Sequence, residues 1–229
     1  MRRFAHMLLV GLMYVLGGST TAAGAPSTTV YRGALNADGT VSAWTTLGAL
    51  PGAQHSLGAV RVRDDIYIVG GSTTANAPVT TVYRTRIDSL GALTAWTAPP
   101  NLPSARTYHG VVQLGGYLYT VGGETTSLTP NDSSVTSGTK ISEVAYATID
   151  LRTGNLATTG WVVNASSLSK ATSKHTVVAA GGSLLTTAGL YNGAATGSSE
   201  QSYAQLDSDG TVGSFSGATG ARTITSAAH

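Results

Sequence analysis

A pattern of roughly 50 residues repeats along the chain and constrains its fold more than any other feature. A glycine pair falls at Gly17–Gly18, Gly70–Gly71 and Gly122–Gly123, and it weakens to Ala188–Gly189. After each pair come a tyrosine, a turn glycine and a larger aromatic residue. The tyrosines are Tyr31, Tyr83, Tyr146 and Tyr203, the glycines are Gly39, Gly91, Gly154 and Gly210, and the aromatic residues are Trp44, Trp96, Trp161 and Phe215. A period of this length indicates supersecondary units that bury their faces against one another.

Each unit reads as four short β-strands. Apolar or alternating runs at Gly110–Leu114, Tyr117–Val121, Thr81–Ile87 and Leu93–Trp96 are bounded by Gly, Pro and Asn or Asp. The sequences NADG, DSLG and DSDG are typical of turns, in which glycine supplies a positive φ. Because no stretch keeps a helical apolar period, we expect an all-β fold with almost no helix. Four strands in each long repeat are typical of a β-propeller.

The order of motifs, AR…H, an apolar strand, YxxGG, VY, a turn with glycine, W and LP, resembles the kelch repeat. It is most similar to the variant found in bacterial surface proteins. The resemblance implies a propeller of four-stranded blades, in which Gly70 and Gly71 end a second strand and Tyr83 and Trp96 pack between blades. The fourth unit departs from the pattern at Ala188 and Phe215, so we expect its blade to be less regular.

We interpret residues 1–229 as one kelch-like domain with repeats at 1–50, 51–102, 103–168 and 169–220. Residues 221–229 resemble the start of a further repeat. Three interpretations remain open: a fragment of a larger propeller, a four-bladed ring, or a half-ring completed by a second chain. The fragment is favoured, and open ends would permit self-association.

The opening stretch, MRRFAHMLLVGLMYVLGG, has the charge and hydropathy of a signal peptide. It also matches the third unit, with Arg3 set against Arg106, His6 against His109 and Gly17 against Gly122 if the hairpin contains a two-residue gap. We therefore predict that this stretch forms the first two strands of a blade and is not a signal peptide.

Composition excludes several classes of function. The 13 basic and 11 acidic residues are too balanced and too few to predict a nucleic-acid partner. The absence of cysteine excludes disulfides, thiolate metal sites and a cysteine nucleophile. The longest apolar run, Met7–Leu16, is too short for a membrane-spanning helix.

Two residue types recur at one phase of the repeat. His6, His109 and His175 could converge on a metal, and Arg3, Arg106 and Arg222 could bind an anion. A position that recurs in every unit is more often structural, so we predict no metal site. The carboxylates of the DSDG turn, Asp207–Gly210, are likewise explained by the turn rather than by calcium.

The insertion at residues 124–140 breaks the repeat, so the repeat does not need it to fold. Loops of this kind often carry function. Together with the start of the third unit, it supplies the candidate ligand-binding residues, which are Arg106, Tyr108, His109, Glu124, Asn131 and Asp132. Asn131 and Asn164 also match the N-glycosylation pattern. We find no catalytic set and predict no cofactor.

The sequence therefore favours a non-enzymatic binding or surface module that presents propeller loops to a protein or glycan partner. Its low charge and its Ser, Thr, Gly and Ala content suit an exported bacterial protein at the cell surface. One alternative is a carbohydrate-active propeller with a site at its axis, formed by Arg106, His109 and the insertion. Another is a purely structural repeat of a cell-surface fibre.

Overall fold

The computed structural model describes residues 5–9, 11–21, 25–74, 77–126, 138–191 and 201–217. Within these ranges the chain forms β-strands joined by turns and loops, and no helix is present. The predicted all-β class is therefore confirmed. In the described part of the chain, nothing resembles a helix that could cross a membrane.

The first sheet begins in the opening stretch. It contains β1 (Ala5–Leu9), β2 (Leu12–Leu16), β3 (Ser27–Ala34) and β4 (Thr45–Gln54), paired antiparallel in chain order. The prediction of two strands in this stretch is confirmed, since β1 pairs with β2 and β2 pairs in turn with β3.

The second sheet has three strands, β5 (Gly58–Val62), β6 (Asp65–Val69) and β7 (Val82–Arg86). The expected strand at Leu93–Trp96 is held only by isolated bridges from Ile87 to Leu93 and from Arg84 to Thr97. Between these bridges the Thr94 hydroxyl accepts a hydrogen bond from the Arg86 amide (3.0 Å). A side chain thus replaces a backbone partner, which interrupts the ladder.

The third and fourth sheets repeat the four-stranded order. The third contains β8 (Gly110–Leu114), β9 (Tyr117–Val121), β10 (Val144–Asp150) and β11 (Asn155–Val163), and β8 and β9 have the predicted bounds. The fourth contains β13 (Thr176–Ala180), β14 (Ser183–Thr187), β16 (Gln201–Gln205) and β17 (Ser216–Gly217). Two short strands, β12 (Thr172–Ser173) and β15 (Leu190–Tyr191), form a small separate sheet.

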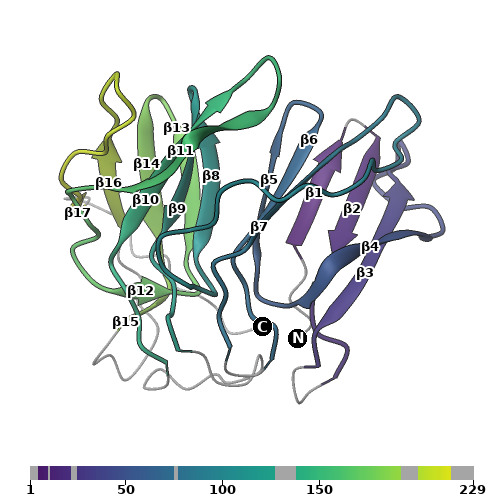
Figure 1. The fold of residues 1–229 in the computed structure, drawn as a ribbon, viewed down its shortest axis with the longest axis horizontal. Helices are drawn as coiled ribbons and strands as arrows, with labels where there is room; N and C mark the ends of the chain where they lie inside the picture. Colours follow the sequence, from purple (N-terminus) through teal and green to yellow (C-terminus); the bar gives the residue numbers. More distant parts are fainter. Residues whose placement is uncertain are drawn as a thin grey trace.

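The four main sheets lie beside one another in chain order (Figure 1). Their first strands are in contact in series, β1 with β5, β5 with β8, and β8 with β13. An apolar cluster fills each of the three spaces between successive sheets. Both faces of the middle sheets are thereby buried, as the five fully buried residues of β6 show. Because side chains alternate along a strand, Tyr67 and Val69 face the third sheet, while Ile66 and Ile68 face the first.

The strand register shows that the predicted equivalence of the four repeat tyrosines is wrong. Tyr31 and Tyr83 pair with Val15 and Ile68, whereas Tyr146 pairs with Tyr119 and Tyr203 with Leu185. The four tyrosines therefore do not share one structural position. A one-residue offset places a side chain on the other face of a sheet. Tyr83 and Trp96 pack against the cluster between the first and second sheets, which agrees with the packing that the resemblance implied.

The two-residue gap expected in the first hairpin is wrong. Leu9 pairs with Leu12 in the first sheet, and Leu114 pairs with Tyr117 in the third, so the two hairpins have equal length. His6 is consequently a residue of β1, opposite Val15, while His109 precedes β8. The predicted equivalence of His6 and His109 does not hold, and Arg3 lies outside the described residues.

Two recurrent hydrogen bonds join each unit of the chain to the next. The Tyr14 and Tyr119 hydroxyls donate to the carbonyls of the turn glycines Gly91 and Gly210 in the next unit, each at 2.9 Å, and Tyr67 bonds Gly154 in the same way. The second glycine of each pair donates its amide to the next unit, as Gly123 does to the Thr172 carbonyl (2.8 Å).

The first glycine of each pair is required for two reasons: its φ is positive, and no room remains for a Cβ atom. Gly122 has a φ of 60°, and a Cβ there would lie 2.5 Å from the Thr172 carbonyl oxygen. Any side chain would therefore push the fourth sheet away from the third. In the fourth unit, Leu185 replaces the linking tyrosine and Ala188 replaces this glycine, which is consistent with the less regular fourth unit expected from the sequence.

Candidate binding site

The antiparallel meander separates two kinds of connection. Short turns, such as residues 36–39 between β3 and β4, follow the third strand at one end of each sheet. Longer loops join the second and third strands at the other end. We call the latter the loop end. The bases of three of these loops are closed by equivalent bridges, Ser19 to Pro26, Ser72 to Pro78 and Glu124 to Lys140. A Glu–Lys pair thus stands where two other units have Ser and Pro, so the repeat itself does not require these charges.

Glu124 is the centre of a buried polar cluster at the base of the insertion. We call this set the Glu124 cluster; its members are Tyr108, Glu124, Lys140, Ser173 and Lys174. Glu124 is 1% exposed and Lys140 is 3% exposed. The Ser173 hydroxyl donates to Glu124 Oε1 (2.6 Å), Lys174 Nζ lies 4.0 Å from the same oxygen, and this ammonium is 4.8 Å from the centre of the Tyr108 ring. Burying charged groups is costly unless they interact in this way.

A backbone ladder between the sheets positions Tyr108 and Lys174. Ser56, Tyr108 and Lys174 precede the first strands of three successive units, and all three adopt a left-handed φ of 50–54°. The Tyr108 amide donates to the Ser56 carbonyl (3.1 Å), and the Lys174 amide donates to the Tyr108 carbonyl (2.9 Å). Because the left-handed conformation recurs at this position, it belongs to the scaffold. The residue type at this position differs between units: it is serine in the second, tyrosine in the third and lysine in the fourth.

The Arg106 side chain has other partners than the Glu124 cluster. Its side chain is fully buried, and its guanidinium donates to the carbonyls of Gly122 and Glu143, each at 3.4 Å, and to the Ser104 hydroxyl (2.6 Å). It also forms an ion pair with the Glu143 carboxylate. Burial lowers the pKa of this guanidinium. All of these partners belong to the same repeat, so the contacts of Arg106 match the structural alternative rather than contact with a ligand.

His109 and His175 fill the space between sheets. A Cβ on Gly70 would lie 2.9 Å from the His109 ring, and a Cβ on Gly122 would lie 2.9 Å from the His175 ring. Burial lowers the pKa of His109 well below its usual range and that of His175 to about 4. Both rings are therefore neutral at neutral pH. No cluster of metal-ligating side chains occurs among the residues that the structure describes.

Three further predictions concerned the insertion residues Asn131 and Asp132, the glycosylation pattern at Asn164 and the DSDG turn. Asn131 and Asp132 lie outside the described residues. Asn164 is 6% exposed, and its amide donates to the Ser166 and Val212 carbonyls, each at 2.8 Å, so it is not accessible to a glycosylating enzyme. In the DSDG turn, Asp209 accepts a hydrogen bond from the Thr211 amide (2.9 Å), which is the role expected of a turn residue.

The structure therefore brings together two of the predicted site residues, Tyr108 and Glu124, and adds Lys140, Ser173 and Lys174. Lys174 aligns with Ser56 and Tyr108, so a comparison of the repeats position by position would have singled it out. The combination of two ammonium groups, one carboxylate and a tyrosine ring can anchor a loop or meet a polar ligand.

Comparisons with known proteins do not add an identity to this geometry: no protein-family model matches the chain, and no curated protein is similar to it.

Proposed function

We propose that this chain is a kelch-type β-propeller module that binds a protein or glycan partner at its loop end without catalysing a reaction. The serial packing of four-stranded antiparallel sheets, with their first strands in contact, supports the propeller part of the proposal. The recurrent interactions between sheets support a rigid scaffold, on which loops are the usual place for recognition.

The Glu124 cluster is the observation that carries the binding part. It departs from the repeat where the insertion leaves the scaffold, and it holds both ends of that insertion. The Glu124–Lys140 bridge closes the base, and the Thr125 amide donates to the Thr139 carbonyl (2.9 Å) one step further out. A loop fixed at its base loses less conformational freedom on binding, which favours affinity.

The carbohydrate-active alternative receives less support. Its proposed axial site depended on Arg106 and His109, and both side chains are buried in contacts within and between sheets. The setting that we propose, the surface of an exported bacterial protein, rests on composition and on the resemblance to kelch repeats. Self-association through uncovered sheet faces belongs to the same proposal.

A deletion tests the site directly. Residues 127–137 are replaced by a short Gly-Ser linker, and the variant is compared with the intact chain on a glycan array and by cross-linking to proteins of the bacterial surface. We expect binding to be lost. A matched control replaces the loop at residues 20–25, which lies at the same end of another sheet and lacks the charged base. Unchanged binding by the first variant, or equal loss by both, would contradict the assignment.

A further inference from the structure

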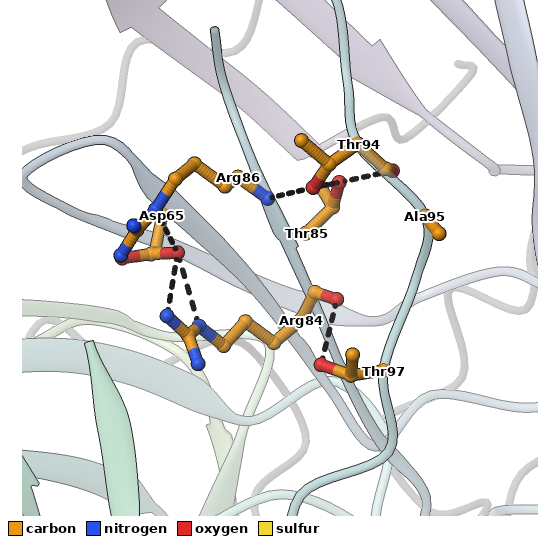
Figure 2. Close-up of a pocket in the computed structure, with 7 residues that line it drawn as sticks. All are labelled: Asp65, Arg84, Thr85, Arg86, Thr94, Ala95 and Thr97. Carbon is orange, nitrogen blue, oxygen red and sulfur yellow. Dashed lines mark hydrogen bonds and ion pairs between the residues drawn. The ribbon is translucent and has the colours of Figure 1, made fainter. Parts of the chain in front are cut away.

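A second charged group lies between the second and third sheets, away from the loop end. The Asp65 side chain is 4% exposed and accepts hydrogen bonds from two guanidinium groups, those of Arg84 (3.0 Å) and Arg86 (3.1 Å). Asp65 and Arg86 are directly paired across β6 and β7. Figure 2 shows Asp65 beside both arginine side chains.

The repeat does not need charge at these positions. The pair equivalent to Asp65 and Arg86 is Leu12 and Ala34 in the first sheet and Tyr117 and Thr148 in the third. Apolar or neutral residues therefore occupy the equivalent positions in these sheets. A buried carboxylate with two arginines is a specific addition to the second sheet.

The group keeps an excess positive charge after its internal pairing. One carboxylate is shared by two guanidinium groups, and the neighbouring Asp64 pairs with Arg61 (3.7 Å). The Thr153 carbonyl accepts further bonds from Arg84 (2.6 Å) and Arg86 (2.8 Å), which ties the group to the third sheet. The Arg86 side chain is still 49% exposed, and its Nη1 donates no hydrogen bond to any residue that the structure describes.

A hollow of about 240 Å³ opens beside these arginines. Besides the charged residues, its lining consists of Thr85, Thr94, Ala95 and Thr97 (Figure 2). It exists because the fourth segment of this sheet is bridged only at its ends. The volume suits a small organic molecule rather than a macromolecule. Its lining combines the Arg86 guanidinium, whose Nη1 can donate to an anionic oxygen, with the hydroxyl groups of three threonines.

We propose that this hollow binds a small hydroxylated carboxylate, with the carboxylate held by Arg86 and the hydroxyl groups meeting the threonine side. The Asp65 carboxylate and the Thr153 carbonyl hold the Arg86 guanidinium in place. This site is separate from the loop end and does not depend on the proposed partner binding.

An NMR titration of the intact chain with D-glucuronate, up to about 20 mM, tests the proposal. This range of concentration detects dissociation constants in the millimolar range. D-glucose lacks the carboxylate and tests whether that group is needed. Acetate lacks the hydroxyl groups and tests whether they are needed. Inorganic phosphate tests the preference for a carboxylate over another anion. We expect glucuronate to bind more tightly than all three. Absence of glucuronate binding, or equally tight binding of glucose, acetate or phosphate, overturns the proposal.

Two variants locate the site. Arg86→Gln should weaken glucuronate binding at least tenfold. Lys170→Gln, which removes an exposed positive charge beside Tyr191, should leave it unchanged. Because Arg86 also contacts the third sheet, Thr97→Val provides a milder test: it should weaken glucuronate but not acetate. Unchanged glucuronate binding in both Arg86→Gln and Thr97→Val places the ligand elsewhere and refutes the assignment.

Discussion

Replacing His175 by leucine should make the protein less sensitive to acid. The imidazole is buried against Gly122, and burial lowers its pKa to about 4, against 6.5 for a free histidine. The unfolded chain therefore binds a proton more readily than the folded protein between these two values. The stability linked to His175 is complete above pH 6.5 and is lost as the pH falls towards 4.

The magnitude follows from the two pKa values. At pH 5 an unfolded histidine is almost fully protonated, while folded His175 is still mostly neutral. The protonation difference then lowers the free energy of unfolding by about 2 kcal/mol relative to neutral pH, at about 1.4 kcal/mol for each pH unit. Leucine cannot take up a proton, so this loss should disappear in His175→Leu. The second unit already has Leu57 at the equivalent position, which shows that leucine fits there.

Urea unfolding near pH 7.5 and near pH 5, followed by tryptophan fluorescence, measures the effect. The fall in unfolding free energy between the two conditions should be about 2 kcal/mol smaller in His175→Leu than in the unchanged protein. Val177→Ala is the control, because it removes a neighbouring apolar contact and should lower stability equally at both pH values. An NMR titration of His175 in the unchanged protein gives a second readout. An equal acid effect in both proteins, or a His175 pKa near 6.5, would refute the reasoning.

Three further substitutions test the scaffold. Gly122→Ala should lower the free energy of unfolding by about 2 kcal/mol more than Gly115→Ala, because both sites have a positive φ but only the first faces a neighbouring carbonyl; equal losses would argue against the close approach. Tyr119→Phe should cost about 1 kcal/mol in urea unfolding, whereas Tyr203→Phe, at a 42% exposed residue, should cost nothing measurable. Arg106→Met should cost about 2 kcal/mol in the same assay, since it leaves the Glu143 carboxylate, which is 27% exposed, and two backbone carbonyls without their donor. It should not change the pattern of bound glycans; a changed pattern with full stability would restore a ligand role.

The repeat was readable from the sequence because its most regular residues serve the contacts between sheets. At the first glycine of a pair, such as Gly122, a carbonyl of the next segment lies where a Cβ would be. The turn glycines Gly91 and Gly210 accept a tyrosine hydroxyl at their own carbonyls. The spacing of residues along the sequence could not show on which face of a strand each tyrosine lies. Tyr83 and Tyr146 occupy similar places in the sequence but differ by one residue in register, which only the strand pairing reveals.

The candidate site was less predictable for a related reason. Regularity draws attention to residues such as Arg106 and His109, whose side chains are buried in contacts within and between sheets. The residues of the Glu124 cluster differ from those at the equivalent positions of other units, and they come from two units. The backbone hydrogen bonds that link Ser56, Tyr108 and Lys174 bring them together. No spacing within one unit could show that Glu124 and Lys174 meet.

The placement of the bonds between sheets has a consequence for how such a chain can change over time. The amide of Gly123 reaches the next unit just before the chain enters the loop at the base of the insertion, and the Tyr119 hydroxyl bonds the turn at the opposite end. A longer or shorter loop therefore alters neither connection. Under the proposed function, replacing the insertion would therefore change what the loop end binds while the assembled sheets stay as they are.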